Sequence, residues 1–114
     1  MYSTELVKGT LQTIILKLLS DNGRMYGYEI THKVLDLSDD KIQLTEGSLY
    51  PTLHKLESEG LLETETVFLG KRKRKYYKLT PPGKKIMSAK LMEISEFMQT
   101  VSRVLNIDPD LSWS

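Results

Sequence analysis

Five consecutive cationic side chains stand beside a glycine between two strand-like runs, in the sequence LGKRKRKYYKLT from Leu69 to Thr80. The whole chain has a formal net charge of only +1, yet positions 71–78 hold six of its 16 Lys and Arg residues. Positive charge gathered at a β-turn has the chemistry needed to bind a polyanion. A plainer explanation is a solvated hairpin tip, where lysines prevent aggregation at a strand edge. The elements that precede the run must decide between the two.

The composition is that of one globular domain. Its 114 residues are 39% hydrophobic and 27% charged, which is enough for one modest core. With no cysteine, the chain has no disulfides and no thiolate metal site, which suits the cytoplasm. No window approaches the roughly 20 apolar residues of a membrane span, and the opening residues lack the apolar stretch of a signal peptide. We therefore expect a soluble cytoplasmic protein that needs no cofactor.

Helical periodicity dominates the first half of the chain. Apolar residues recur at intervals of three and four between Leu6 and Leu19, and this helix should stop at Asp21-Asn22-Gly23. A second short helix is predicted by Tyr26, Ile30, Val34 and Leu37, and a minimal strand by Ile42 and Leu44.

A third helix is predicted after the side chain of Thr45, which suits an N-cap. It should bury Leu49, Leu53 and Leu56 and end near Gly60. Because proline fits best in a first turn, Pro51 predicts that this helix begins near Gly47 or that its opening turn is irregular.

A hairpin and a long helix follow. Residues 62–69 read as a strand, Gly70 as its turn, and Tyr77 and Leu79 as core-facing positions of the return strand. Pro81 and Pro82 suit the start of a last helix that reaches about Leu105. The expected fold is mainly α with a small β-hairpin, that is, a winged helix-turn-helix over residues 1–80, a C-terminal dimerisation helix over 81–108 and a tail over 109–114.

In a winged helix-turn-helix the third helix enters the major groove of DNA and the hairpin lies along the backbone or the minor groove. The outward face of the predicted third helix is small and polar and lacks Arg, Asn and Gln, so base discrimination is expected to be modest or partly indirect. Three glutamates make this helix locally acidic, so the hairpin must supply much of the attraction. The candidate DNA contacts are Ser48, Tyr50, Pro51, His54 and Lys55 on the helix and Lys71, Arg72, Lys73, Arg74 and Lys75 on the hairpin; for His54 an ordinary exposed position is the alternative.

Three motifs in this order resemble the PadR family of bacterial transcriptional regulators. They are YGYEI (26–30), TEGSLYPTLHKLESEGLL (45–62) and KRKYYKLTPPG (73–83), after the opening KGTLQTIILKLL (8–19). The resemblance implies a homodimeric winged-helix protein, usually a repressor, that binds an inverted-repeat operator and is often released by a small, commonly aromatic molecule. It also implies DNA contacts at Ser48, Tyr50 and Pro51. Of the other motif residues, we expect Gly27 to permit close packing, and Tyr28 and Tyr77 to support the core or the hairpin.

The last helix has a heptad-like seam of apolar residues, which favours a partner helix and hence a homodimer. The alternative is that the helix folds back onto its own domain. Methionines and a phenylalanine on this helix would suit an adaptable pocket for a small apolar effector, although such residues are more often plain core. The candidate interface residues are Met87, Leu91, Ile94, Phe97, Met98, Val101 and Leu105.

An enzyme is the first rival class, and the chain offers it little. His54 and Glu57 have a His-x-x-Glu spacing but no apparent third ligand, and phosphate loops and nucleophile motifs are absent. The second rival is a winged helix used as a protein-interaction module, with its basic hairpin docked on an acidic partner. Binding to an inverted-repeat duplex separates that module from a DNA-binding regulator.

Overall fold

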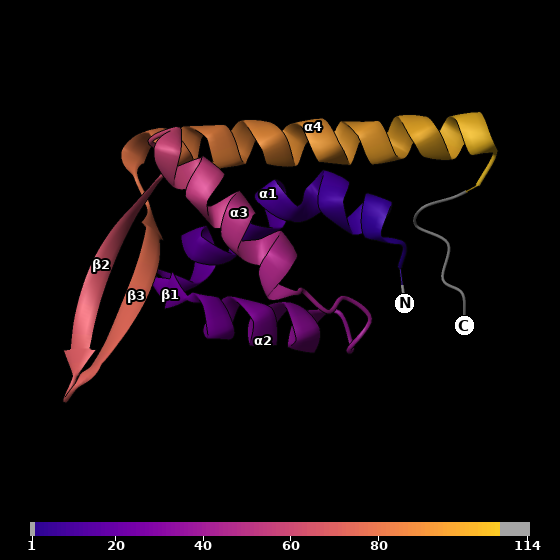
Figure 1. The fold of residues 1–114 in the computed structure, drawn as a ribbon. Coiled ribbons are helices and arrows are strands. Elements are labelled where there is room, and N and C mark those ends of the chain that lie inside the picture. Colours follow the sequence, from indigo (N-terminus) through magenta and orange to yellow (C-terminus); the bar gives the residue numbers. More distant parts are fainter. Residues whose placement is uncertain (1, 108–114) are drawn as a thin grey trace.

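The computed structural model describes residues 2–107, which form four helices and a three-stranded antiparallel sheet (Figure 1). The expected class, mainly α with a small β element, is confirmed. The predicted tail, residues 109–114 with Trp113, lies outside the described residues, as does residue 108 of the predicted last helix. The elements are α1 (Thr4–Asn22), β1 (Met25–Tyr26), α2 (Gly27–Leu37), α3 (Glu46–Ser58), β2 (Leu62–Leu69), β3 (Arg72–Leu79) and α4 (Pro81–Leu105).

One hydrophobic core holds the helices and the base of the hairpin together. The apolar stripes of α1, α2 and α3 converge in it, and Ile15, Ile30 and Leu53 are fully buried. Tyr77 of β3 and Met87 of α4 complete the same cluster. The predicted buried face of the third helix, made by Leu49, Leu53 and Leu56, is confirmed.

The predicted ends of the helices are also confirmed. Helix α1 stops at Gly23, whose φ of +75° is a left-handed conformation that glycine adopts without strain. The hydroxyl of Thr45 accepts the N–H of Ser48 at 3.2 Å and caps α3. At the start of α4 the hydroxyl of Thr80 accepts the N–H of Gly83 at 3.1 Å.

The opening of α3 accommodates Pro51 in its second turn. The N–H groups of Ser48 and Leu49 both donate to the carbonyl of Thr45, at 3.2 and 2.9 Å, so the first turn is tighter than a regular α-helix. The helix begins at Glu46, close to the predicted Gly47. The start of the helix is thus close to the prediction and its first turn contains one tighter bond, but Pro51 lies in the second turn and not in the first.

The sheet contains a strand that sequence periodicity does not reveal. The prediction of a strand at Ile42 and Leu44 is wrong, because these side chains pack against the core from an irregular segment. The third strand is instead β1, which pairs with β3 through Met25–Tyr77 and Tyr26–Tyr76. Strand β3 is thus central and its other edge pairs with β2 along eight residue pairs. We call the β2–β3 hairpin, residues 62–79, the wing.

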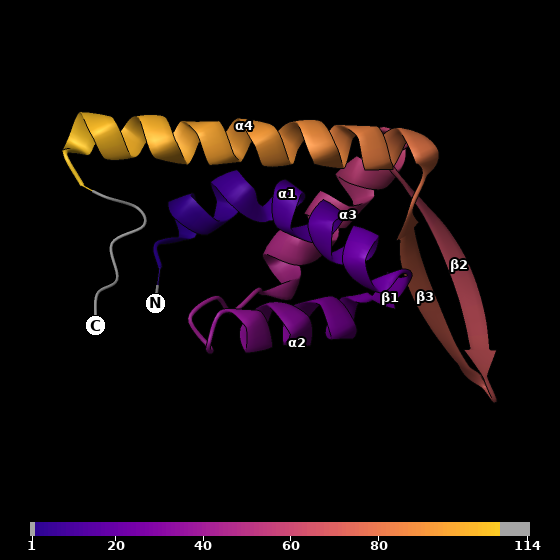
Figure 2. The same cartoon turned by 180° about the vertical axis from the view of Figure 1, so that it is seen from behind.

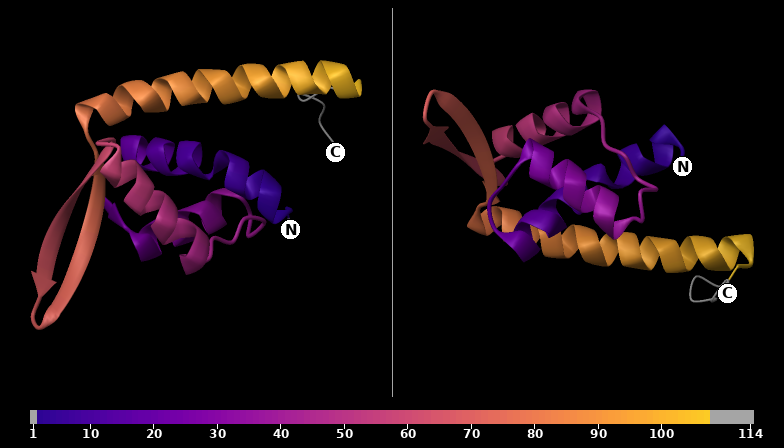
Figure 3. Two further views of the ribbon diagram at one scale, coloured as in Figure 1. Left: turned by 45° about the horizontal axis from the view of Figure 1, so that its top comes forward. Right: turned by 90° about the horizontal axis from the view of Figure 1, so that it is seen from below.

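Helix α4 lies along α1 and projects beyond the rest of the domain (Figures 2 and 3). Near its start Met87 is buried and Leu91 is half-buried against the core. Further along, Phe97 and Leu105 are 64% and 61% exposed. The first half of the helix therefore belongs to its own domain, while the second half presents apolar side chains to the outside. None of the helices in residues 2–107 has a stretch long and apolar enough to cross a bilayer.

Gly83 fixes the start of α4 against the preceding loop. A Cβ atom there would overlap the carbonyl oxygen of Leu61 and lie 3.1 Å from both the Leu61 carbonyl carbon and the Leu79 Cδ2. Because backbone must move to admit a methyl group, we expect Gly83→Ala to lower the free energy of unfolding by about 2 kcal/mol. Urea unfolding checks this value. Gly47→Ala is the control, since a Cβ at Gly47 meets nothing within 4 Å and alanine should leave stability unchanged or raise it. Equal effects of the two substitutions would contradict this packing role.

Candidate nucleic-acid interface

The outward face of α3 carries the predicted helix contacts. Pro51, His54 and Lys55 are exposed, and Tyr50 is 37% exposed. Ser48 is half-buried, and its hydroxyl accepts from Thr45 Oγ1 at 3.1 Å while it donates to the Thr45 carbonyl at 3.0 Å. The hydroxyl of Ser48 is thus already engaged in the helix cap, whereas the other four side chains are available on the surface.

The ring of Tyr50 packs closely against Gly27, at the start of α2. A Cβ atom at Gly27 would overlap the Tyr50 hydroxyl oxygen and lie 2.9 Å from the Tyr50 Cζ. The expectation that Gly27 permits close packing is confirmed. The absence of a side chain at Gly27 lets α2 and α3 approach and orients the Tyr50 ring beside His54, with their centroids 6.4 Å apart.

The cationic run is not confined to the turn of the wing. Only Lys71 lies between the strands, next to Gly70, and Arg72 is already the first residue of β3. The run therefore continues along β3, where successive side chains point to opposite faces. This corrects the picture of a cationic loop tip, since the charge is distributed along one strand and over both of its faces.

One face of the wing turns toward α3. Lys73 and Lys75 of β3 line the same hollow of about 370 Å³ as Tyr50 and His54 of α3. The Lys75 Nζ lies 3.8 Å from the Glu57 carboxylate of α3, and the Lys73 Nζ lies 5.8 Å from the centroid of the Phe68 ring. The fold thus brings predicted helix contacts and predicted wing contacts to a single concave surface.

The other face of β3 carries the side chains of Arg74 and Tyr76, which contact Tyr26 of the paired strand β1; Arg74 and Tyr26 also line the hollow beside α3. The guanidinium carbon of Arg74 lies 4.1 Å from the centroid of the Tyr26 ring, and Arg74 is only half exposed. Next along the strand, Tyr76 meets the Tyr26 ring edge-on at 5.4 Å. Arg24 covers Tyr76 at 4.5 Å and pairs with Glu65 at 2.8 Å. Arg74 is therefore part of an aromatic and cationic cluster partway along the wing, beside β1.

The acidity of α3 is reduced on the side that faces the wing. The carboxylate of Glu57 accepts a hydrogen bond from Thr64 Oγ1 at 3.3 Å and is paired with Lys75, while Glu46 and Glu59 lie at the two ends of the helix. Burial, with a smaller contribution from the Glu57 charge, raises the pKa of Tyr77 above its ordinary value. The raised pKa keeps the Tyr77 hydroxyl protonated, so this side chain adds no negative charge beside Lys73 and Lys75.

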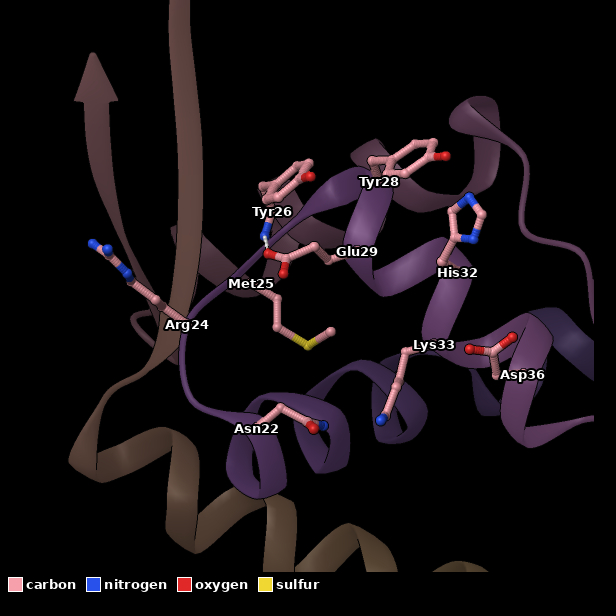
Figure 4. Close-up of a pocket in the computed structure, with 9 residues that line it drawn as sticks. All are labelled: Asn22, Arg24, Met25, Tyr26, Tyr28, Glu29, His32, Lys33 and Asp36. Atoms are coloured by element: carbon pink, nitrogen blue, oxygen red, sulfur yellow. Dashed lines mark hydrogen bonds between the residues drawn. The ribbon is translucent and has the colours of Figure 1, made fainter. Parts of the chain in front are cut away.

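Sequence reasoning missed the exposed aromatic surface at the start of α2. Tyr28 is 63% exposed, so the prediction that it supports the core or the hairpin is wrong, whereas Tyr77 does so. The ring of Tyr28 stacks on that of Tyr26, with the centroids 6.3 Å apart, and its centroid lies 4.2 Å from that of the His32 ring (Figure 4). The Glu29 carboxylate accepts the N–H of Tyr26 at 3.2 Å and fixes this turn. The sequence Tyr26-Gly27-Tyr28 does not indicate which of the two tyrosine side chains points toward solvent.

The described residues also bear on metal binding. No group of three or more His, Asp or Glu side chains gathers in residues 2–107 in a way that could hold an ion. The histidine and glutamate of the His-x-x-Glu spacing instead have different surroundings. His54 faces the hollow between α3 and the wing, and Glu57 is paired with Lys75.

Comparisons with known proteins agree on one family. The model of the "Transcriptional regulator PadR-like family" matches residues 15–89. The transcriptional regulator Rv3488 of Mycobacterium tuberculosis is 31% identical over 97 residues, which cover 85% of this chain and 87% of that protein.

Solved structures give the same result for the fold. A transcriptional regulator from Clostridium thermocellum has a TM-score of 0.78 at 29% identity and covers 90% of this chain and 97% of its own. A PadR family transcriptional regulator from Eggerthella lenta has a TM-score of 0.77 at 31% identity and covers 91% of this chain and 88% of its own. With its winged-helix fold and the match over residues 15–89, the chain belongs to the PadR-like family of transcriptional regulators and is a DNA-binding regulator, not an enzyme.

Proposed function

We propose that the protein is a homodimeric, sequence-specific repressor that binds an inverted-repeat operator. The observation that carries the proposal is the shared concave surface, where Tyr50 and His54 of α3 and Lys73 and Lys75 of the wing line one hollow. A helix in the major groove and a cationic hairpin on the adjacent backbone would use these two walls together. As a DNA-binding regulator, the protein would act in the cytoplasm.

In this proposal the two walls have different roles. The cations of the wing supply affinity through phosphate contacts, which do not depend on sequence. On α3, Tyr50, His54 and Lys55 face the base edges, and Pro51 and Gly47 let the backbone approach the groove. A Cβ at Gly47 would meet nothing within 4 Å, which is consistent with an open surface at this end of the helix.

The proposed dimer uses the distal half of α4. A groove between α1 and α4 is lined by polar and charged side chains together with the apolar side chains of Leu6, Ile94 and Phe97. Leu6 is 66% exposed and Met98 56% exposed in the single chain, so both are free to be covered by a second copy. Met87 is buried in its own core and contributes little to such an interface; the proposed contacts are Leu91, Ile94, Phe97, Met98, Val101 and Leu105. A two-fold pair would set the two α3 helices about 34 Å apart, one turn of DNA, and would require a palindromic site.

Release by a small apolar or aromatic ligand completes the proposal. The support is chemical, since Phe97 and Met98 are large, exposed and adjacent on the distal half of α4. Methionine adapts to irregular shapes, and a ligand held between two such helices would alter the spacing of the DNA-binding surfaces.

Selection of bound fragments from genomic DNA tests the proposal. We expect recovery of an inverted repeat whose binding is competed poorly by random DNA and falls on the order of 10³ to 10⁵ between 50 and 200 mM salt, for six to ten phosphate contacts. Recovery of protein partners alone, with no duplex affinity, would favour the protein-interaction module instead.

Replacement of Lys55 tests the assignment of base contacts to α3. We expect Lys55→Ala to cost about 1–3 kcal/mol on the selected operator and to relax its preference at one position of each half-site, with little effect on random DNA. Binding to a panel of single-base operator variants measures this. Lys84→Ala removes the same charge from α4 and is the matched control; a uniform loss over all sequences would make Lys55 a phosphate contact.

A further inference from the structure

The cations of the run at 71–75 divide into two groups by what they touch. Arg74 stacks on Tyr26 at 4.1 Å, and Lys75 lies 3.8 Å from the carboxylate of Glu57. Lys71 and Arg72 are exposed and, among residues 2–107, have no acidic side chain within 4 Å. The run therefore has a free end at the turn and an engaged end near the middle of the wing.

Arg74 joins the wing to the strand that leads into α2. Tyr26 is its partner, and Figure 4 shows the Tyr26 ring beside that of Tyr28, at the start of that helix. Tyr76 reinforces the junction through an edge-on contact with Tyr26 at 5.4 Å and through Arg24 at 4.5 Å. A guanidinium plane on an aromatic face is a directional contact that a lysine does not reproduce.

Lys75 joins the opposite face of the wing to α3. Its ammonium group pairs with the Glu57 carboxylate, which also accepts a hydrogen bond from the hydroxyl of Thr64 in β2. The Lys75 Nζ lies 5.4 Å from the centroid of the buried Tyr77 ring. Arg74 and Lys75 thus connect the wing to two different elements, β1 through Tyr26 and α3 through Glu57, and both line the hollow between the wing and α3.

We propose that Arg74 and Lys75 are positioning residues that set the angle of the wing against α3, and that the DNA contacts of the run are made from Lys71 to Lys73. The inference rests on the proposed function and assigns a division of labour within the same site. Isolated two-stranded hairpins are marginal in water, so a wing without these contacts would lose fixed geometry. A wing held in place before binding does not have to be ordered by the DNA.

Conservative substitutions separate positioning from contact. Arg74→Lys keeps the charge and removes the planar stack, and we expect about ten-fold weaker operator binding with an unchanged salt slope. Arg103→Lys, the matched control, makes the same exchange at an exposed position of α4, away from the wing, and should bind within about two-fold of the wild type. In combination with Tyr26→Leu, Arg74→Lys should add little, since both remove the same contact. Wild-type affinity of Arg74→Lys would overturn the inference.

Replacement of Glu57, the partner of Lys75, tests whether Lys75 positions the wing or contacts phosphate. The two roles predict opposite changes in DNA affinity. Glu57→Gln removes a negative charge from the interface, so a purely electrostatic role predicts tighter DNA binding. If Glu57 and Lys75 position the wing, Glu57→Gln should instead weaken binding, by about three-fold for an exposed pair. Tighter binding would assign Lys75 to the phosphate-contacting group.

A measurement without DNA keeps this inference separate from the proposed function. Backbone ¹⁵N order parameters of residues 66–74 should stay near the rigid value of about 0.85 in the wild type and in the control Arg103→Lys. In Arg74→Lys they should fall toward about 0.6. If the wild type failed to bind duplex DNA, the proposed function would be lost while this result still decided the positioning role. Equal order parameters in Arg74→Lys and the wild type would overturn it.

Discussion

Replacing Lys71 and Arg72 together with alanine is expected to lower DNA affinity on the order of 10²- to 10³-fold at 0.15 M salt, with the same factor on every sequence. A dimer has two wings, so the double substitution removes four cations from the complex. Each phosphate contact contributes about 0.9 to the slope of log affinity against log salt, so the slope should decrease by about 3 to 4. Titrations of labelled duplexes at several salt concentrations measure both quantities.

The matched control for this experiment lies in α4. Lys84→Ala with Lys85→Ala removes the same charge from two exposed positions that are not on the wing. We expect the control to change the slope by well under one unit. If the two double variants lost affinity equally, the net charge of the protein and not the wing would govern attraction to DNA.

The substitution Phe97→Glu is expected to have the second large effect, on the stability of the proposed dimer. Phe97 is 64% exposed in the single chain, on the part of α4 that we propose is covered by a second copy. In a two-fold interface each substitution occurs twice, so a cost of about 2 kcal/mol per ring would raise the dissociation constant of the dimer by roughly 10³. Sedimentation at micromolar concentration should then show monomers, and affinity for the full operator should fall by at least about 100-fold as the two half-sites lose their linkage.

Gln99→Glu places the same charged group two residues further along α4 and is expected to leave both the dimer and operator binding intact. Thermal unfolding of the separate variants checks that the domain core is preserved. A Phe97→Glu protein that still sedimented as a dimer would show that α4 pairs through another face, and would remove this residue from the proposed interface.

The helices and their ends followed from the sequence because each signal is local. The stripe of Leu49, Leu53 and Leu56, the cap at Thr45 and the stop at Gly23 depend only on residues within a few positions of one another. The hairpin was equally evident, since β-branched residues, a glycine at φ +64° and a buried Tyr77 lie in order along one short segment.

The features that sequence did not yield depend on register and on contacts between distant segments. A two-residue strand such as Met25–Tyr26 has too few positions for a period, and it exists because β3 offers a free edge beside it. The stack of Arg74 on Tyr26 requires that pairing register, which no local pattern encodes. The outward position of Tyr28 follows from the start of α2 at Gly27.

The candidate site shows the same division. Helical spacing, the expected order of elements and the resemblance to PadR regulators placed Tyr50, His54 and the cations of the wing in one functional group, and the hollow between α3 and the wing brings several of them together. The sequence of residues 71–75 did not indicate which of these cations contact other side chains of the protein and which do not. It arises because a strand sends alternate side chains to opposite faces and the fold places a different neighbour on each face.

The junction at Gly60, Leu61 and Gly83 ties three elements to one point. Thr80 donates its hydroxyl to the Gly60 carbonyl at 2.7 Å and its N–H to the Leu61 carbonyl at 3.1 Å, where α3 ends and β2 is about to begin. Helix α4 starts from the same place and runs for 25 residues, about 37 Å. Because α4 begins at this junction and also packs along α1, a displacement of its far end is expected to be passed to the end of α3 and the start of β2.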